Sequence, residues 1–212
     1  VVMGRNAGED LTSAASNVII GVDAAKQGTT SENNVVIGTN AQGSGIATGN
    51  NNVVLGYGAG FDMTSGADNV AIGVNAGKEI TIGAYSTLVG RNAGAEMIEE
   101  RLTAVGYYAG GNTTGNLNNY FGFNCGSGNT SGTNNVAFGY NALYQPDTET
   151  HNLAIGNDAL SGAIAGGEYN VAIGNLALDA VTAGDNNVAV GYNAGTGVTT
   201  GVQNVFVGDA AG

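Results

Sequence analysis

The side chains that most often carry out chemistry are few and scattered in this chain. Its 212 residues include one histidine, His151, and one cysteine, Cys125. A catalytic triad or a zinc site needs several such groups within reach of one another. The sequence therefore predicts no enzyme activity and no disulfide framework, and we interpret His151 as a solvated loop residue.

Carboxylates are more numerous, with 17 Asp and Glu against 5 Lys and Arg, and the net charge is −12. Several recur in turns, where their oxygens suit a structural calcium ion. These are Asp62, Asp68, Asp147, Glu149, Asp158, Asp179 and Asp185. The Gly-Gly-X-Gly-X-Asp nonapeptide of calcium-binding β-rolls is absent from the sequence. We expect no cofactor, and structural calcium is the alternative.

The acidic balance also bears on partners. A net charge of −12 repels nucleic-acid phosphates and anionic membrane surfaces. Apolar runs are only a few residues long, so no segment is expected to insert into a bilayer. We expect neither nucleic acid nor membrane as a partner.

A repeat of about 17 residues organises the whole chain and positions all of these groups. Its thirteen anchor glycines are Gly4, Gly21, Gly38, Gly56, Gly73, Gly90, Gly106, Gly122, Gly139, Gly156, Gly174, Gly191 and Gly208. The residues one and three before each glycine are mostly apolar, as in Val18 and Ile20, and share one face of a strand. The residue three after it is Ala except at Cys125, which predicts a tightly packed site.

The links between repeats carry a second pattern. Seven or eight residues after the glycine is an apolar position that includes Leu11, Ile46, Met63, Ile80, Met97, Ile164, Val181 and Val198. Turn-forming residues flank it, so we expect a second short strand in each link. The fold class predicted is all-β, a parallel β-solenoid or β-roll of about thirteen 17-residue coils in one array over residues 1–212.

Two polar columns run along this array. Asparagine recurs four residues before the glycine, at Asn17, Asn34, Asn52, Asn69, Asn118, Asn135, Asn152, Asn170, Asn187 and Asn204. Stacked amides both donate and accept hydrogen bonds, so we predict a structural Asn ladder. A Thr column eight after the glycine, as in Thr29 and Thr199, raises ice binding as an alternative, although Thr also simply favours strands.

Aromatic residues gather one position after the glycine. Tyr107, Phe123 and Tyr140 fall in three successive coils and are expected to stack as a stripe. Exposed, this stripe offers a surface for sugar rings of a glycan; buried, it is a ladder inside the core or at a contact between chains. The coils of about 78–125 are the most irregular, with Ser86-Thr87 and Leu102-Thr103 in place of Asn-Val and a candidate helical turn over 95–101.

The motif Asn69-Val70-Ala71-Ile72-Gly73-Val74-Asn75-Ala76-Gly77 resembles the head repeats of YadA-like trimeric autotransporter adhesins. The stretch from Asn135 to Leu143 resembles the repeats of bacteriophage tail fibres. The repeat here is longer than in YadA-like heads. The resemblance implies a trimeric β-roll with a role in adhesion, at a virion or cell surface.

These observations lead to one expectation of function and one alternative. A 17-residue coil encloses little volume, so we expect a homotrimer with the apolar columns around a shared axis. We expect a slice of a longer extracellular fibre, acting as a non-catalytic structural or adhesive shaft. A monomeric β-solenoid that binds ice or a glycan is the alternative.

Overall fold

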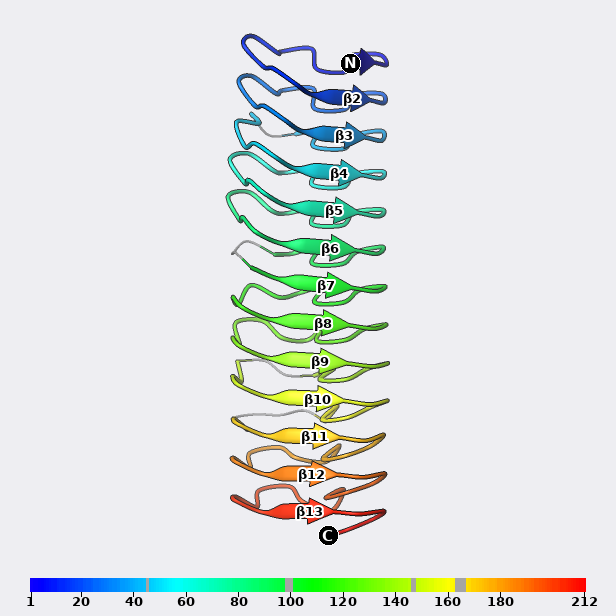
Figure 1. Ribbon diagram of the computed structural model, residues 1–212, viewed down its shortest axis with the longest axis vertical. Coiled ribbons are helices and arrows are strands. Elements are labelled where there is room, and N and C mark those ends of the chain that lie inside the picture. Colours follow the sequence, from blue (N-terminus) through cyan, green and yellow to red (C-terminus); the bar gives the residue numbers. More distant parts are fainter. Residues whose placement is uncertain (45, 98–100, 146–147, 163–166) are drawn as a thin grey trace. The chain divides into compact units, whose positions relative to one another are not determined.

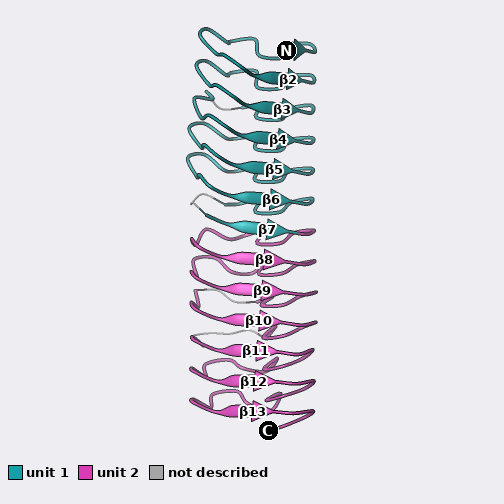
Figure 2. Ribbon diagram, in the orientation of Figure 1, with its two compact units in different colours: residues 1–105 teal, residues 106–212 magenta. Residues whose placement is uncertain are grey.

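The computed structural model describes residues 1–44, 46–97, 101–145, 148–162 and 167–212. Its described part is all-β, with thirteen short parallel strands and no helix, so the predicted β-solenoid fold is confirmed. The chain divides into two compact units, 1–105 and 106–212, shown in different colours in Figure 2. Each unit is described by itself.

In both units each strand is one rung of a coil, and the next coil places its strand alongside (Figure 1). Unit 1 contains β1 Val2–Met3, β2 Val18–Ile20, β3 Val35–Ile37, β4 Val53–Leu55, β5 Val70–Ile72, β6 Thr87–Val89 and β7 Thr103–Val105. Unit 2 contains β8 Asn119–Phe121, β9 Val136–Phe138, β10 Leu153–Ile155, β11 Val171–Ile173, β12 Val188–Val190 and β13 Val205–Val207.

The register places equivalent residues of successive coils beside one another. Val35 pairs with Val53 and Ile37 with Leu55, for example. The anchor position after each strand must be glycine, because φ there is positive and the next coil leaves no room for a side chain. A Cβ on Gly139 (φ 143°) would lie 2.3 Å from the carbonyl oxygen of Gly156, so the glycine column fixes the closeness of the coils.

The core of each unit is thin and is filled by three kinds of position. The middle residue of a strand points inward, as Val54 and Leu88 do, while the residues on either side of it point outward. From Ala24 to Ala194 the Ala column is fully buried, and Cys125 occupies it with no exposed surface, which confirms the predicted tight site. Link residues such as Met63 and Ile80 fill the third position.

In several coils, core volume is balanced between two columns. Where the middle strand residue is large, as at Tyr120, the residue four after the anchor is Gly126, and a Cβ there would lie 2.5 Å from the tyrosine ring. Where it is Ala137, that residue is Leu143, also fully buried. Other coils are small in both columns, as at Ala71 with Gly77, and there the Leu88 side chain of the next coil fills the space, 2.8 Å from where a Gly77 Cβ would lie.

The prediction of a second strand in each link is wrong for the described residues. The links there are turns and bends, in which single backbone bonds such as Thr64 N–H to Thr81 O (2.9 Å) join neighbouring coils. Frequent Gly and Ser interrupt any ladder. Ile46 is also not a core residue: it is exposed, and Ala47 is buried instead. Ile164, and residues 98–100 of the candidate helical turn, lie outside the described residues.

Candidate functional site

The Asn column forms a buried ladder within each unit. Asn135 illustrates the geometry: its Oδ1 accepts a hydrogen bond from the backbone N–H of Asn152 at 2.9 Å, and its Nδ2 donates to the Glu149 carbonyl at 2.8 Å. The same pair of bonds recurs in both units, for example at Asn52. The amides therefore hold strand and link of the next coil together. Among the described members of this column, direct amide-to-amide bonds run from Asn187 to Asn170 and from Asn204 to Asn187.

Two of the irregular coils interrupt this column. Ser86 takes the Asn position in β6's coil, and its Oγ accepts a bond from Leu102 N–H at 3.2 Å. The Ser86 hydroxyl thus reproduces the accepted hydrogen bond, which is one of the two bonds that an Asn amide makes to the next coil.

The Thr column uses its hydroxyls within the stack. Thr12, Thr64, Thr114 and Thr182 each donate through Oγ1 to a carbonyl of the next coil. An ice-binding array presents free hydroxyls, so this arrangement counts against that alternative.

The three stripe residues of unit 2 do stack. The ring centroids of Tyr107 and Phe123 lie 4.8 Å apart at 13°, and those of Phe123 and Tyr140 lie 5.4 Å apart at 11°. All three are exposed. Because neighbouring ring faces cover one another, the stripe presents mainly ring edges, and its faces are not free to stack on sugars along its length.

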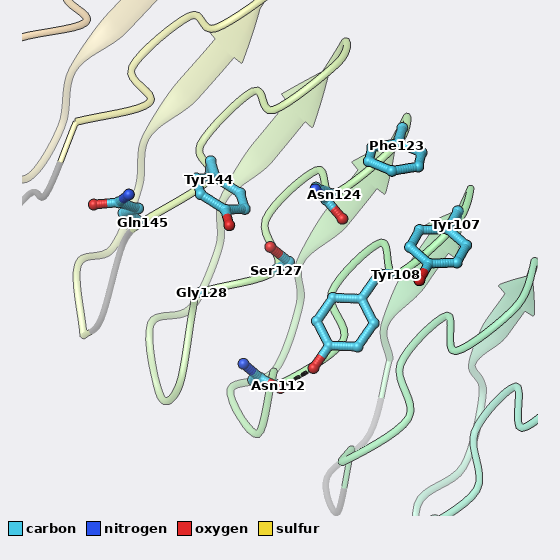
Figure 3. A pocket seen from close by; sticks show the side chains of 9 residues that line it. All are labelled: Tyr107, Tyr108, Asn112, Phe123, Asn124, Ser127, Gly128, Tyr144 and Gln145. Carbon is cyan, nitrogen blue, oxygen red and sulfur yellow. Dashed lines mark hydrogen bonds between the residues drawn. The ribbon is translucent and has the colours of Figure 1, made fainter.

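Beside this stripe lies a groove of about 550 Å³, which we call the tyrosine groove (Figure 3). It is lined by Tyr107, Tyr108, Asn112, Phe123, Asn124, Ser127, Gly128, Tyr144 and Gln145. None of these side chains is charged. Sequence reasoning found the stripe but missed the other lining residues; the available signal was Tyr108, an aromatic residue in a column that is mostly Asn.

The side chains of the tyrosine groove are positioned by the coils beneath them. Tyr108 Oη donates to Asn112 Oδ1 at 2.8 Å, and one face of its ring lies on Gly111, where a Cβ would clash with it. Ser127 is 3% exposed, and its hydroxyl oxygen is not one of the buried side-chain atoms left without a hydrogen-bond partner. In Figure 3 Ser127 lies between Tyr144 and Tyr108.

The remaining chemical groups do not assemble. His151 is exposed and stacks on Tyr169 with centroids 4.7 Å apart. Over the described ranges, no three or more His, Cys, Asp or Glu side chains gather as a metal site would require. Burial, with the nearby Asp158, raises the pKa of the Asp179 carboxyl. Asp147, one of the calcium candidates, lies outside the described residues.

Burial dominates the titration of two core groups. It raises the pKa of the Cys125 thiol to about 12 and moves the pKa of Tyr120 above its ordinary value, although Asn129 donates to the Tyr120 hydroxyl at 2.6 Å. Both groups are neutral at physiological pH, and neither is accessible to a substrate.

Comparisons with protein-family models, with curated proteins and with solved structures give no match to this chain. The described residues also contain no helix of the length and apolar character that crossing a bilayer demands.

Proposed function

We propose that this protein is a non-catalytic shaft of an extracellular fibre and that its coils assemble as a homotrimer through the outward face of the strands. The observation that carries the proposal is the character of that face, which we call the apolar strand face. It consists of the first and last residues of each three-residue strand, such as Val136 and Phe138.

The apolar strand face is uncharged, and its residues range from half-buried to exposed. Phe138 is 57% exposed, and Val136, Ile155 and Leu55 are each more than a third exposed. None of the residues in the thirteen strands is charged, although the chain carries 22 charged residues elsewhere (17 acidic and 5 basic). Monomeric proteins rarely leave a contiguous apolar patch of this kind uncovered, and interfaces are depleted of charge at their centres.

The occupant best suited to this face is another copy of the chain. Copies share one coil spacing, so ridges of Val and Ile on one copy match the ridges on the next, with breaks at the polar residues Thr87, Thr103 and Asn119. A stable interface buries about 800 Å² per partner, and the outward strand residues recur in every coil of each unit. A thin, Ala-rich core gains most from this extra burial.

The role of a shaft follows from what the coils do and do not contain. Each coil is bonded to the next by strand pairing, the Asn ladder and the glycine column. Such a stack transmits position and load from coil to coil without a reactive group. The resemblance of the motif to adhesin and tail-fibre repeats supports an extracellular fibre as the setting.

The test is the mass of the purified chain in solution, measured by light scattering with the circular dichroism spectrum. A mass near three times 20.9 kDa is expected. Phe138→Lys on the apolar strand face should shift the mass toward one chain while the β spectrum persists. Ile82→Lys, at a 64% exposed link residue, is the matched control and should leave the mass unchanged. A wild-type monomer would overturn the trimer and favour a monomeric binding module.

A further inference from the structure

The tyrosine groove combines features that a structural coil does not need. The Ser127 hydroxyl lines the groove, makes no hydrogen bond within the described residues and is not one of the buried unpaired atoms, so it is open to water or to a ligand. Asn112 uses Oδ1 for Tyr108, and its Nδ2 has no partner among the described residues. The groove therefore offers hydrogen-bonding groups that the fold leaves unused.

Apolar surface lies next to these polar groups. The inner face of Tyr108 rests on Gly111, and Figure 3 shows its ring broadside in the view into the groove, so the other face is turned outward. Tyr144 lies across Ser127 from it, and the edges of Tyr107 and Phe123 border the same space. Two aromatic side chains thus flank a polar floor.

We propose that the tyrosine groove binds a neutral carbohydrate, with one pyranose ring against Tyr108 or Tyr144 and its hydroxyls bonded to Ser127, Asn112 and Asn124. A pyranose has an apolar C–H face and a rim of hydroxyls that each donate and accept. The volume of about 550 Å³ lies within the range of small-molecule sites. This binding site is independent of the shaft function proposed above.

The charge of the site selects among ligand classes. No lining residue is charged, so an anionic sugar would be desolvated without a counter-charge. The net charge of −12 repels such a ligand further. A flat apolar ligand would leave the Ser127 hydroxyl and Asn112 Nδ2 unpaired, which a neutral polyol avoids, whereas Asn124 Nδ2 already donates to Asn141 Oδ1 at 3.4 Å.

Saturation-transfer NMR of the full chain with methyl glycosides of glucose, galactose, mannose and N-acetylglucosamine tests the proposal. At least one glycoside at about 10 mM, near the weak limit of specific binding, should receive saturation from the protein. Ser127→Ala should weaken its affinity about three- to tenfold, as the loss of one hydrogen bond does. Tyr144→Ala should weaken it about tenfold or more.

Tyr192→Ala is the matched control, since Tyr192 follows an anchor glycine as Tyr107 does but lies outside the groove. It should bind as the wild type does. Absence of saturation with all four glycosides, equal weakening by Tyr192→Ala, or stronger binding of sialic acid than of any neutral glycoside would each overturn the site. Circular dichroism of every variant separates lost binding from lost folding, and the mass of the assembly reports on the shaft proposal separately.

Discussion

Asn52 accepts a hydrogen bond from the backbone N–H of Asn69 at 3.0 Å and donates one to the Gly66 carbonyl at 2.8 Å. One side chain thus satisfies two buried backbone groups of the next coil, one beside the strand and one in the link. This bridge keeps strand and link in step in a coil whose link has no strand of its own.

Removal of this amide should be costly. Asn52→Ala leaves the Asn69 N–H and the Gly66 carbonyl unpaired, and we expect the free energy of unfolding to fall by about 2–4 kcal/mol. Urea unfolding followed by circular dichroism measures it. Asn204→Ala, in the same column, removes only a donated bond to Asn187 Oδ1 and should cost about 1 kcal/mol or less. Equal losses in both variants would contradict a bridging role.

A substitution at Gln42 should increase the stability of the fold. Its side chain is fully buried, and neither polar atom has a hydrogen-bond partner in the described structure. Leu160 and Leu178 occupy the same column with φ of 50° and 52°, like the 50° of Gln42. Gln42→Leu should therefore raise the stability by about 1–2 kcal/mol, as relief of an unpaired amide does.

The matched variant for this position is Gln42→Ala, which removes the amide but leaves space unfilled. Thermal unfolding should rank the leucine variant above both the wild type and the alanine variant. A leucine variant less stable than the wild type would show that the buried amide has a partner in solution.

The glycine column predicts a sharp contrast between two alanine substitutions. Gly139→Ala places a Cβ 2.3 Å from the Gly156 oxygen at a φ of 143°, so neighbouring coils must separate. We expect a loss of about 3 kcal/mol or more, measured by thermal unfolding. Gly197→Ala meets no atom within 4 Å and should change stability by less than about 0.5 kcal/mol. Tolerance of Gly139→Ala would refute the close approach.

High pH should destabilise the fold through two buried acids. The pKa of Cys125 rises from 9.0 to about 12 on burial, and the pKa of Tyr120 also rises. Between pH 9 and 12 the unfolded chain has lost the thiol proton that the folded chain still holds, so stability falls as pH rises through this window. Below pH 9 the thiol keeps its proton in both the folded and the unfolded chain, so it causes no loss of stability there.

Cys125→Ala, which restores the residue found at this position in every other repeat, separates the two groups. The variant should lose less stability between pH 9 and 10, while the decline due to Tyr120 persists at higher pH. Denaturant unfolding at stepped pH gives both slopes. An unchanged slope in the variant would show that the thiol is accessible in the folded state.

The sequence predicts much of this fold because its period is strict. The spacing of the anchor glycines indicates coils, and the apolar pair around each middle residue indicates a strand, as at Val70 and Ile72. Parallel stacking follows from equal coil lengths. The Ala column predicts a tightly packed site directly from the sequence, because only a small residue recurs there.

Other features depend on the three-dimensional arrangement, which the repeat in the sequence does not determine. A three-residue strand has no unique inward face by alternation alone, so the burial of Ala71 rather than Val70 or Ile72 had to be seen in the structure. The sequence predicts a strand in the links because their apolar residue followed by Thr is a pattern that short strands also have. The tyrosine groove combines Tyr108, Ser127 and Tyr144 from three coils, and their meeting depends on how each link folds over its neighbour.

The balance of volume between the middle strand residue and the residue four after the glycine has an evolutionary consequence. Gly77 leaves room for the Leu88 side chain of the next coil, and Gly195 for the Leu178 side chain of the coil before it, so a repeat settles its volume with its neighbours as well as within itself. A repeat copied or deleted by unequal recombination would keep a close-packed core only where its new neighbours match the old ones, and the chain's length is therefore tied to the order of its repeats.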